Sequence, residues 1–306
     1  MKTTRSGLTM IEIMVVVGII AILIGLLIPA VHTVQRMAKE TKQKAQFTAI
    51  ELGLAAFKSD YGDYPPSFWF DPSATGTTAA LRNYCGAQKL AEAMVGWDLM
   101  GFHPDSAWRA DGLDKSGTAN TVYLETDTLK KRRGRYVELD VANPFLLGGG
   151  TDSLFPGGVV DLAPRTYVLC DVFTRPERKI QQIDGKLVAA GTPILYYKAN
   201  PASLIHHPVS WSQTSVCIYD ARDNAPILNQ GLLADSAKLP TLRRQHDLAP
   251  GIRPGTTSFE YFYDFYIRDM RIQGRQWPVR PDSYLLISAG MDGIYGTEDD
   301  IRNFGQ

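Results

Sequence analysis

Several acidic residues near the end of the chain are spaced closely enough to bind a divalent cation. Segment 288–301 reads SAGMDGIYGTEDDI and contains Asp292, Asp299 and Asp300. Hard cations such as Ca²⁺ take several carboxylate and carbonyl oxygens at ~2.3–2.6 Å from a loop that can bend. The glycines of this segment permit such bends. Because the register differs from that of an EF-hand, the pattern predicts either another kind of calcium loop or an acidic surface turn.

Glu12 is a second acidic residue with possible chemistry, because it is the single charge between Leu8 and Val31. The 19 uncharged residues from Ile13 to Val31 would form about 28 Å of helix, close to the ~30 Å hydrocarbon core of a bilayer. A carboxylate costs on the order of 2.5–3.5 kcal/mol at the centre of a membrane helix and usually has a partner there. Glu12 is therefore expected either to pair within an assembly or to lie at the lipid headgroups.

A dense basic cluster runs from Lys130 to Arg135 (KKRRGR). It could contact DNA or an acidic neighbour, but no aromatic residues interleave it as in single-strand binding platforms. We interpret it as a solvated loop, and His206-His207, which lack a carboxylate or cysteine at ligand spacing, as surface histidines. The sequence has no GxSxG, HExxH or phosphate-binding glycine motif. Since catalytic triads assemble from distant positions, that absence alone does not exclude an enzyme.

Composition narrows the class of protein. The 306 residues include 32 Lys+Arg and 32 Asp+Glu, so the net charge is zero, which argues against a dedicated nucleic-acid binder. Apolar residues make up 44% and charged residues 21%, as expected of a folded protein. A mean hydropathy of −0.14 excludes a polytopic membrane protein and leaves room for one membrane helix. Three cysteines are too few for a disulfide scaffold and lack the spacing of a zinc site, and their pairing stays open: Cys85, Cys170 and Cys217.

The first element predicted from the sequence is a long helix. Polar residues follow Val31 without a helix breaker, and apolar residues then recur at three- and four-residue spacing, which predicts one buried stripe. We predict a transmembrane helix over 8–31 and an amphipathic continuation over 32–60, so that the helix runs from about Leu8 to about Ser59 before YGDYPP ends it. The stripe consists of Phe47, Ile50, Leu54, Phe57 and Tyr61.

Residues 61–306 are predicted to form a globular α+β head with a mostly antiparallel sheet, against which the amphipathic half of the helix packs. A short helix is predicted at 90–100, Asp184-Gly185 is a good hairpin turn, and Ser258–Arg268 fits either a helix or a strand. The predicted strands are Arg135–Val141, Arg165–Phe173, Lys179–Ala189, Thr192–Ala199, Thr214–Tyr219 and Ser283–Ala289.

The residues before the apolar segment indicate its orientation in the membrane and where it could be cleaved. Lys2 and Arg5 precede it, so the positive-inside rule keeps the N-terminus cytoplasmic and sends the head across the membrane. The apolar stretch is longer than the ~7–15 residues of a signal peptide, and no Ala-x-Ala cleavage site follows it. Instead, Ser6-Gly7 stands before Leu8. A plain signal anchor remains the alternative.

In this order and spacing, the N-terminal residues resemble the type IV pilin and type II secretion pseudopilin family. Members carry a short basic leader ending in glycine, then a methylated hydrophobic residue, glutamate four positions later, and an apolar helix with a proline that loosens it. Here these are residues 1–7, Leu8, Glu12 and Pro29. The resemblance implies that a prepilin peptidase cuts between Gly7 and Leu8, that Leu8 is N-methylated, and that Glu12 pairs with the Leu8 amine of a neighbouring subunit.

The other end of the chain is similar to the C-terminal calcium loop of major pseudopilins, which pairs an Asp-Gly with a later Asp-Ile. That similarity implies Asp292 and Asp300 as ligands, with Asp299 as a further candidate, and a structural role for Ca²⁺ in ordering the end of the head. The head, at about 245 residues, is larger than that of an ordinary major pseudopilin, which leaves a minor or tip role open.

The expected function is that of a non-enzymatic subunit of a type II secretion pseudopilus, a filament that helps to export folded proteins. The resemblance implies an inner-membrane, single-pass protein with its head in the periplasm. Its implied partners are further copies of itself, other pseudopilins, prepilin peptidase, the inner-membrane assembly platform and membrane lipid, whereas nucleic acid is not expected. The alternatives are a type IV pilin for adhesion or DNA uptake, and a membrane-anchored extracytoplasmic enzyme.

Overall fold

The computed structural model describes residues 9–70, 83–113, 122–123, 126–176, 178–181, 187–249 and 259–305. The chain divides into two compact units, residues 1–42 and 43–306, and each is described by itself. Three predicted features lie outside the described residues: the leader 1–7 with its terminal Gly7, the methylation residue Leu8, and the Asp184-Gly185 turn.

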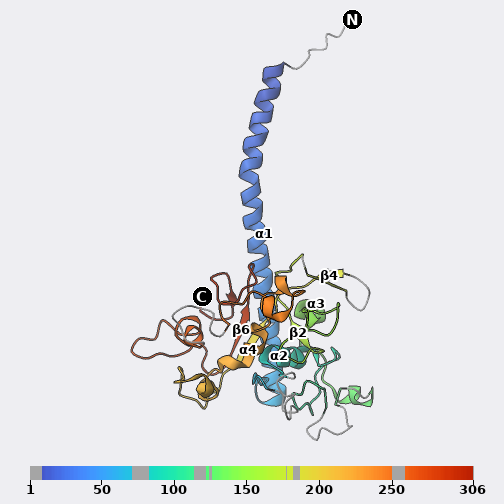
Figure 1. The fold of residues 1–306 in the computed structure, drawn as a ribbon, viewed down its shortest axis with the longest axis vertical. Coiled ribbons are helices and arrows are strands. Elements are labelled where there is room, and N and C mark those ends of the chain that lie inside the picture. The colour runs from blue at the N-terminus through green and yellow to red at the C-terminus, as the bar shows by residue number, and fades with distance from the viewer. Residues whose placement is uncertain are drawn as a thin grey trace. The chain divides into compact units, whose positions relative to one another are not determined.

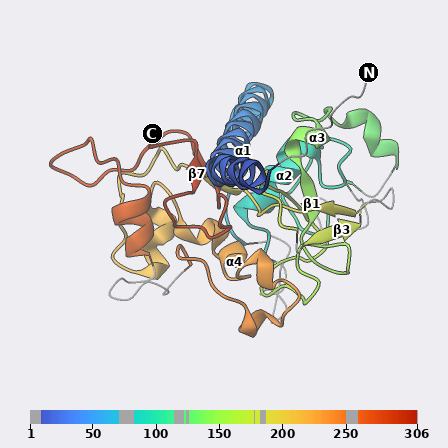
Figure 2. The same cartoon turned by 90° about the horizontal axis from the view of Figure 1, so that it is seen from above.

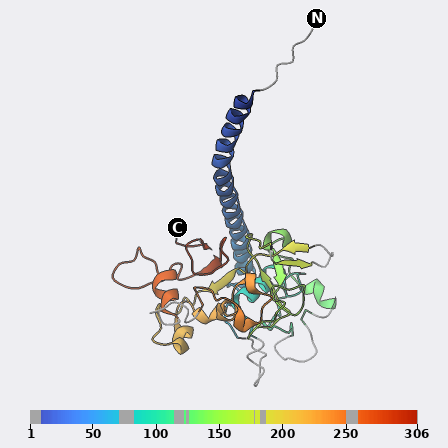
Figure 3. The ribbon, with the colours of Figure 1, turned by 45° about the horizontal axis from the view of Figure 1, so that its top comes forward.

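Helix α1 (Met10–Tyr61) is continuous over 52 residues, close to the predicted span (Figures 1 and 3). It passes through Pro29 without a break, although proline cannot donate a helical hydrogen bond. The carbonyl of Pro29 also accepts a bond of 3.0 Å from the Thr33 hydroxyl. In its first part the apolar side chains are exposed, and α1 is long and apolar enough by length and composition to cross a membrane.

The part of α1 that belongs to the second unit buries one face against the head. Phe47, Ile50, Leu54 and Phe57 are buried as predicted, and Tyr61 is half-buried with its ring centroid 4.6 Å from that of Phe57. Two glutamines and a glycine complete this face, which the apolar pattern alone did not predict: Gln43, Gln46 and Gly53.

The named strands of the head form three small antiparallel sheets, in agreement with the predicted α+β class. The largest has the order β5-β6-β7, with Tyr197 opposite Leu285. The strands are β1 (Pro144–Leu146), β2 (Tyr167–Leu169), β3 (Lys179–Gln181), β4 (Leu187–Ala189), β5 (Leu195–Lys198), β6 (Tyr284–Ser288) and β7 (Ile301–Arg302), and the other two sheets pair β1 with β2 and β3 with β4.

Two predicted strands are wrong. In place of Arg135–Val141 the chain forms a helical turn, α3 (Leu139–Ala142), which ends at Asn143 in the left-handed conformation with φ 51°. In place of Thr214–Tyr219 it forms the 3₁₀ helix η3 (Trp211–Val216), where the Thr214 hydroxyl donates to the Trp211 carbonyl at 3.1 Å. Local side-chain and turn geometry therefore outweighs β-propensity at both places.

The remaining elements are helical. The predicted helix at 90–100 is observed as α2 (Gly86–Val95), so it starts earlier than predicted. It also ends earlier, because Gly96 at φ 90° terminates it. Segment Ser258–Arg268, predicted as helix or strand, contains the π-helix η7 (Tyr261–Tyr266). The others are η2 (Thr126–Lys131), η4 (Ala221–Asn224), α4 (Ala225–Leu228), η5 (Leu233–Asp235) and η6 (Pro240–Leu242).

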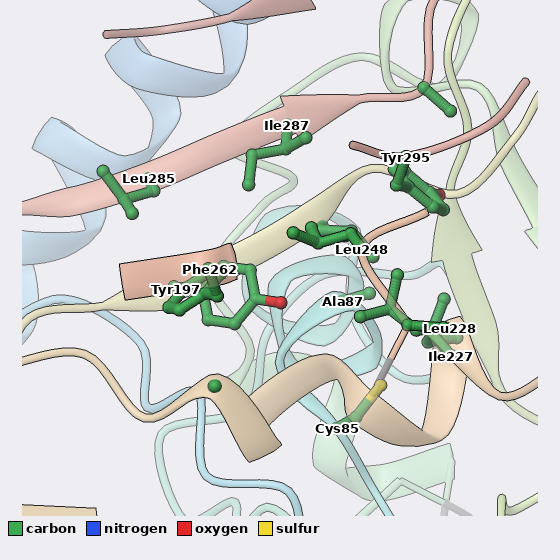
Figure 4. Close-up of a cluster of buried hydrophobic side chains, with 14 of the residues drawn as sticks. Cys85, Ala87, Tyr197, Ile227, Leu228, Leu248, Phe262, Leu285, Ile287 and Tyr295 are labelled. Atoms are coloured by element: carbon green, nitrogen blue, oxygen red, sulfur yellow. The ribbon is translucent and has the colours of Figure 1, made fainter. Parts of the chain in front are cut away.

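The core of the head surrounds α2, all ten residues of which are buried. One hydrophobic cluster joins the head-packed face of α1 to α2 and to one face of the sheet β5-β6-β7, called the central sheet from here on. A second lies on the other face of that sheet, where Tyr197, Leu285 and Ile287 gather with Phe262 and Leu248 (Figure 4). Figure 2 shows β1 and β3 on one side of the head and the C-terminal segment after β7 on the other.

Candidate functional site

Glu12 caps the start of α1. Its carboxylate accepts hydrogen bonds from the backbone N–H of Thr9 at 2.8 Å and from the Thr9 hydroxyl at 2.9 Å. In return, the Thr9 hydroxyl oxygen accepts from the Glu12 N–H at 3.3 Å. This is a capping box, which satisfies N–H groups that the first turn of a helix leaves unpaired. Its Thr-x-x-Glu signature stands in the sequence, but this capping role was not predicted beside the two expected for Glu12, pairing within an assembly or a position at the lipid headgroups.

The acidic segment 288–301 folds into a tight loop between β6 and β7. Asp292 accepts a bond from the Ile294 N–H at 2.7 Å, and its own N–H donates to the Asp299 carboxylate at 3.0 Å. Asp300 accepts from the Gly296 N–H at 2.7 Å. The structure thus brings the three predicted aspartates into one loop, each bound to that loop's own backbone.

Asp300 lies deepest of the three. One of its oxygens, Oδ2, accepts from the Tyr266 hydroxyl and the Gly296 N–H, while the buried Oδ1 has no hydrogen-bond partner among the described residues. Burial raises the pKa of Asp300 to about 7, and the charges of Asp299 and Asp292 add to the rise. Burial also raises the pKa of Asp292. A cation would relieve both effects, since it compensates the charge and occupies a free oxygen.

The donor set fits Ca²⁺ in its chemistry, because carboxylate and carbonyl oxygens are the ligands that this ion prefers. In the described part of the chain, no three histidine, cysteine, aspartate or glutamate side chains gather closely enough to hold a metal ion by themselves. Asp292, Asp299 and Asp300 would therefore need backbone carbonyls or water to complete a calcium shell.

The start of this loop is anchored in the core by Asp171. Its carboxylate accepts from the Ser288 hydroxyl at 2.9 Å and from the N–H groups of Thr192 at 3.0 Å and Phe173 at 3.2 Å. Ser288 in turn accepts from the Gly290 N–H at 3.3 Å. Burial raises the pKa of Asp171 to about 7. This anchor was not predicted, because its partners are distant in the sequence.

Gln46 and Gln43 fix α1 against α3 and the segment that follows β2. The Gln46 amide nitrogen donates to the carbonyls of Val141 at 2.7 Å and Cys170 at 2.9 Å. The Gln43 carbonyl oxygen accepts from the Val172 N–H at 2.9 Å. Neither glutamine was predicted to be buried, although both stand at helical spacing in line with Phe47 and Ile50.

The basic cluster is not uniformly solvated, so that interpretation is wrong for Arg132. Its guanidinium is buried and donates to Asp98 at 2.7 Å and to the Tyr123 carbonyl at 2.9 Å. Arg135 donates to the Leu99 carbonyl at 2.6 Å, whereas Lys130 and Lys131 end η2. At least two members of the cluster therefore hold the head together.

The histidines and cysteines also have structural surroundings. His206 is buried, against the surface prediction, and its Nε2 lies 2.8 Å from the Tyr263 carbonyl. The partly exposed His207 lies 3.4 Å from Asp264. All three cysteines are buried and unpaired, and burial raises the pKa of Cys85 to about 12, which keeps this thiol protonated and unreactive.

Comparison with known proteins supports the predicted family resemblance. The chain is 44% identical over 64 residues to the type II secretion system core protein G of Pseudomonas aeruginosa. The match covers 21% of this chain and 45% of that relative, so the chain spans less than half the length of the curated relative that it matches. No protein-family model and no solved structure matches. Together with the long apolar helix α1, this match confirms the predicted resemblance to the pilin and pseudopilin family over part of the chain.

Proposed function

We propose that this chain is a structural, non-enzymatic subunit of a type II secretion pseudopilus. The similarity to a type II secretion core protein carries the proposal. Helix α1 supports it, because one continuous element supplies both an exposed apolar segment of membrane-spanning length and a face buried in the head. In this role the subunits assemble with one another and with other pseudopilins into a filament that helps to export folded proteins.

Maturation and topology follow from the residues before α1. Lys2 and Arg5 hold the N-terminus in the cytoplasm, and the head enters the periplasm. Prepilin peptidase removes residues 1–7 and the new amine of Leu8 is methylated. The inner-membrane assembly platform then takes the subunit from the lipid into the filament.

The mature N-terminus tests this proposal directly. The chain is isolated from its native membrane and its N-terminal peptide is identified by mass spectrometry. N-methyl-Leu8 is the expected first residue. An intact Met1, under conditions where the peptidase is active, would refute maturation by this route and would bring forward a membrane-anchored enzyme.

Glu12 has two roles in this proposal. Before assembly its carboxylate is held by Thr9 in the capping box. In the filament it accepts the Leu8 amine of a neighbouring subunit, because a charged partner compensates a carboxylate at membrane depth better than a hydroxyl does.

Two substitutions separate these roles. Glu12→Gln keeps the capping box, in which glutamine also serves, but removes the charge, whereas Glu12→Ala removes both. If pairing with the amine matters, both variants fail to form filaments although both are processed. Normal filaments from Glu12→Gln and defective ones from Glu12→Ala would show that Glu12 acts only as a cap.

We also propose that the loop 288–301 binds Ca²⁺ through Asp292, Asp300 and Asp299, with the ion ordering the end of the head. The unpartnered oxygen of Asp300 and the folding of all three aspartates into one loop support this proposal. Calcium should raise the melting temperature of the full-length chain in detergent. Isothermal titration should detect the ion in the wild type and in the exposed control Asp282→Ala, but not in Asp292→Ala. A wild-type chain that neither binds nor is stabilised would refute the site.

A further inference from the structure

Two adjoining grooves cross the head where α1 meets the C-terminal residues. The first, of about 510 Å³, lies between α1 and the segment that follows β7. The second, of about 260 Å³, lies between that segment and the residues after η7. Both are lined by Arg302, Phe304 and Gly305, so we treat them as one surface and call it the basic groove.

The basic groove carries uncompensated positive charge. Five basic and two acidic side chains line it, and both acidic ones are already paired. Glu51 binds Arg280 at 3.0 Å, and Asp269 binds Arg271 at 2.8 Å. Within the described ranges, the three other basic side chains have no acidic partner within ion-pair distance: Lys44, Arg268 and Arg302.

Arg302 is held in place by aromatic rings rather than by a carboxylate. Its guanidinium carbon lies 5.0 Å from the ring centre of Tyr266 and 5.3 Å from that of Phe304. One nitrogen donates to the Tyr266 carbonyl at 3.3 Å. Since a guanidinium has five N–H donors, most of them remain available. A carboxylate suits such donors in charge and geometry.

The same chain carries an acidic loop of four carboxylates. Asp292, Glu298, Asp299 and Asp300 form no ion pair with any described lysine or arginine. Asp292 and Glu298 are exposed. Within one copy Asp300 is directed to Tyr266 and Gly296, so it does not neutralise Arg302. The net charge of the whole chain is zero, and on the head this acidic loop adjoins the basic groove at Tyr266, whose hydroxyl binds Asp300 and whose ring contacts Arg302.

We propose that the basic groove of one copy binds the acidic segment 297–300 of a second copy, with Glu298 as the leading contact. This inference rests on the proposed function, which brings copies side by side in a filament. Because the contact joins two different surfaces, it can repeat from subunit to subunit without closing. Glu298 is not one of the proposed calcium ligands, so a bound ion leaves its carboxylate free.

A charge exchange between the two surfaces tests the contact. Self-association of the full-length chain in detergent micelles is followed by analytical ultracentrifugation. Arg302→Glu alone and Glu298→Arg alone should each weaken association at least about tenfold, because like charges then face each other. An equimolar mixture should associate again, since each variant offers the partner surface that the other needs. Salt should weaken the wild-type contact by screening.

Two further variants control for folding and for general charge effects. Lys44→Glu changes an exposed helix residue of the groove and should behave like Arg302→Glu even if the latter disturbs β7. Lys179→Glu changes an exposed residue outside the groove and should associate as the wild type does. Thermal melts should show that the variants keep the wild-type transition.

The outcomes distinguish this inference from the proposed function. If the wild type associates and the reversals have no effect, or if the mixture fails to restore what each reversal removes, the groove does not bind the acidic segment. A wild-type chain that does not associate at all refutes the contact as well. The identity of the mature N-terminus is measured independently, so the pseudopilin proposal stands or falls on that result.

Discussion

Replacing Gln46 should weaken the attachment of α1 to the head, because this one side chain makes two hydrogen bonds there. Its amide nitrogen donates to two carbonyls, those of Val141 at 2.7 Å and Cys170 at 2.9 Å. Gln46→Leu preserves most of the side-chain volume but removes this donor. Gln46→Glu goes further, because it places an acceptor-only carboxylate against two carbonyl oxygens.

The expected loss in the free energy of unfolding depends on the two carbonyls that are left without the Gln46 donor. Each buried carbonyl left without a donor costs roughly 1–3 kcal/mol. Cys170 keeps a weaker bond of 3.3 Å from the Asn143 amide, and the bond to the Val141 carbonyl is only partly buried, so both losses lie below the upper end of that range. Leucine also removes the Gln46 carbonyl oxygen, which is buried without a partner in the described residues, and this offsets about 1 kcal/mol. The free energy of unfolding should fall by about 2 kcal/mol in Gln46→Leu and by more than about 3 kcal/mol in Gln46→Glu.

Hydrogen exchange read by mass spectrometry measures these differences in the full-length chain in detergent. The amides of α2 and of the central sheet report the free energy of opening of the head. Ala45→Leu changes the exposed neighbouring residue and should shift it by less than about 0.5 kcal/mol. Equal protection in Gln46→Glu and Gln46→Leu, or protection in Gln46→Leu at the wild-type level, would refute the view that the amide donor holds the helix.

Two other substitutions test the buried parts of the head. Burial raises the pKa of Asp171 to about 7 from 3.8, so the folded state binds a proton more tightly than the unfolded state, and stability should fall by about 3 kcal/mol as the pH rises from 4 to 7. Asp171→Asn should remove that part of the pH dependence in urea unfolding, and an unchanged slope would contradict the assignment. An ideal Cβ at Gly53 would lie 2.8 Å from Val137 and 2.9 Å from Met94, so Gly53→Ala should cost about 1 kcal/mol after its gain in helix propensity. Val137→Ala should restore part of that loss in a double-mutant cycle.

The sequence predicts α1 well and the head only coarsely, for a physical reason. A single apolar stripe repeated over many turns is a strong periodic pattern, and it locates Phe47, Ile50, Leu54 and Phe57 correctly. The named strands of the head span only two to five residues, which is too short for an alternating pattern to be distinctive. The β-branched residues of Thr214–Tyr219 therefore suggest a strand where side-chain and turn contacts favour a 3₁₀ helix.

The candidate site residues divide in the same way. Local motifs single out Glu12 and the aspartates of loop 288–301 as candidates, because their spacing alone suggests the chemistry. Arg132 could not be assigned from the sequence, since its partner Asp98 lies 34 residues away. A cluster of like charges therefore looks solvated until the fold supplies the opposite charge for one of its members.

Helix α1 both packs against the head and lines the basic groove, and both depend on how the helix is rotated about its axis. At 3.6 residues per turn, Gln46 and Gly53 share one flank, whereas Lys44 and Glu51 lie on the opposite one. The first flank is fixed by the two bonds of Gln46 and by the close approach of Val137 to Gly53. That setting turns Lys44 and Glu51 into the basic groove. A helix rotated by one residue would turn about 100°, break the glutamine contacts and move the lysine out of the groove. The polar residues buried under α1 therefore set the charge that this side of the head presents to a second copy.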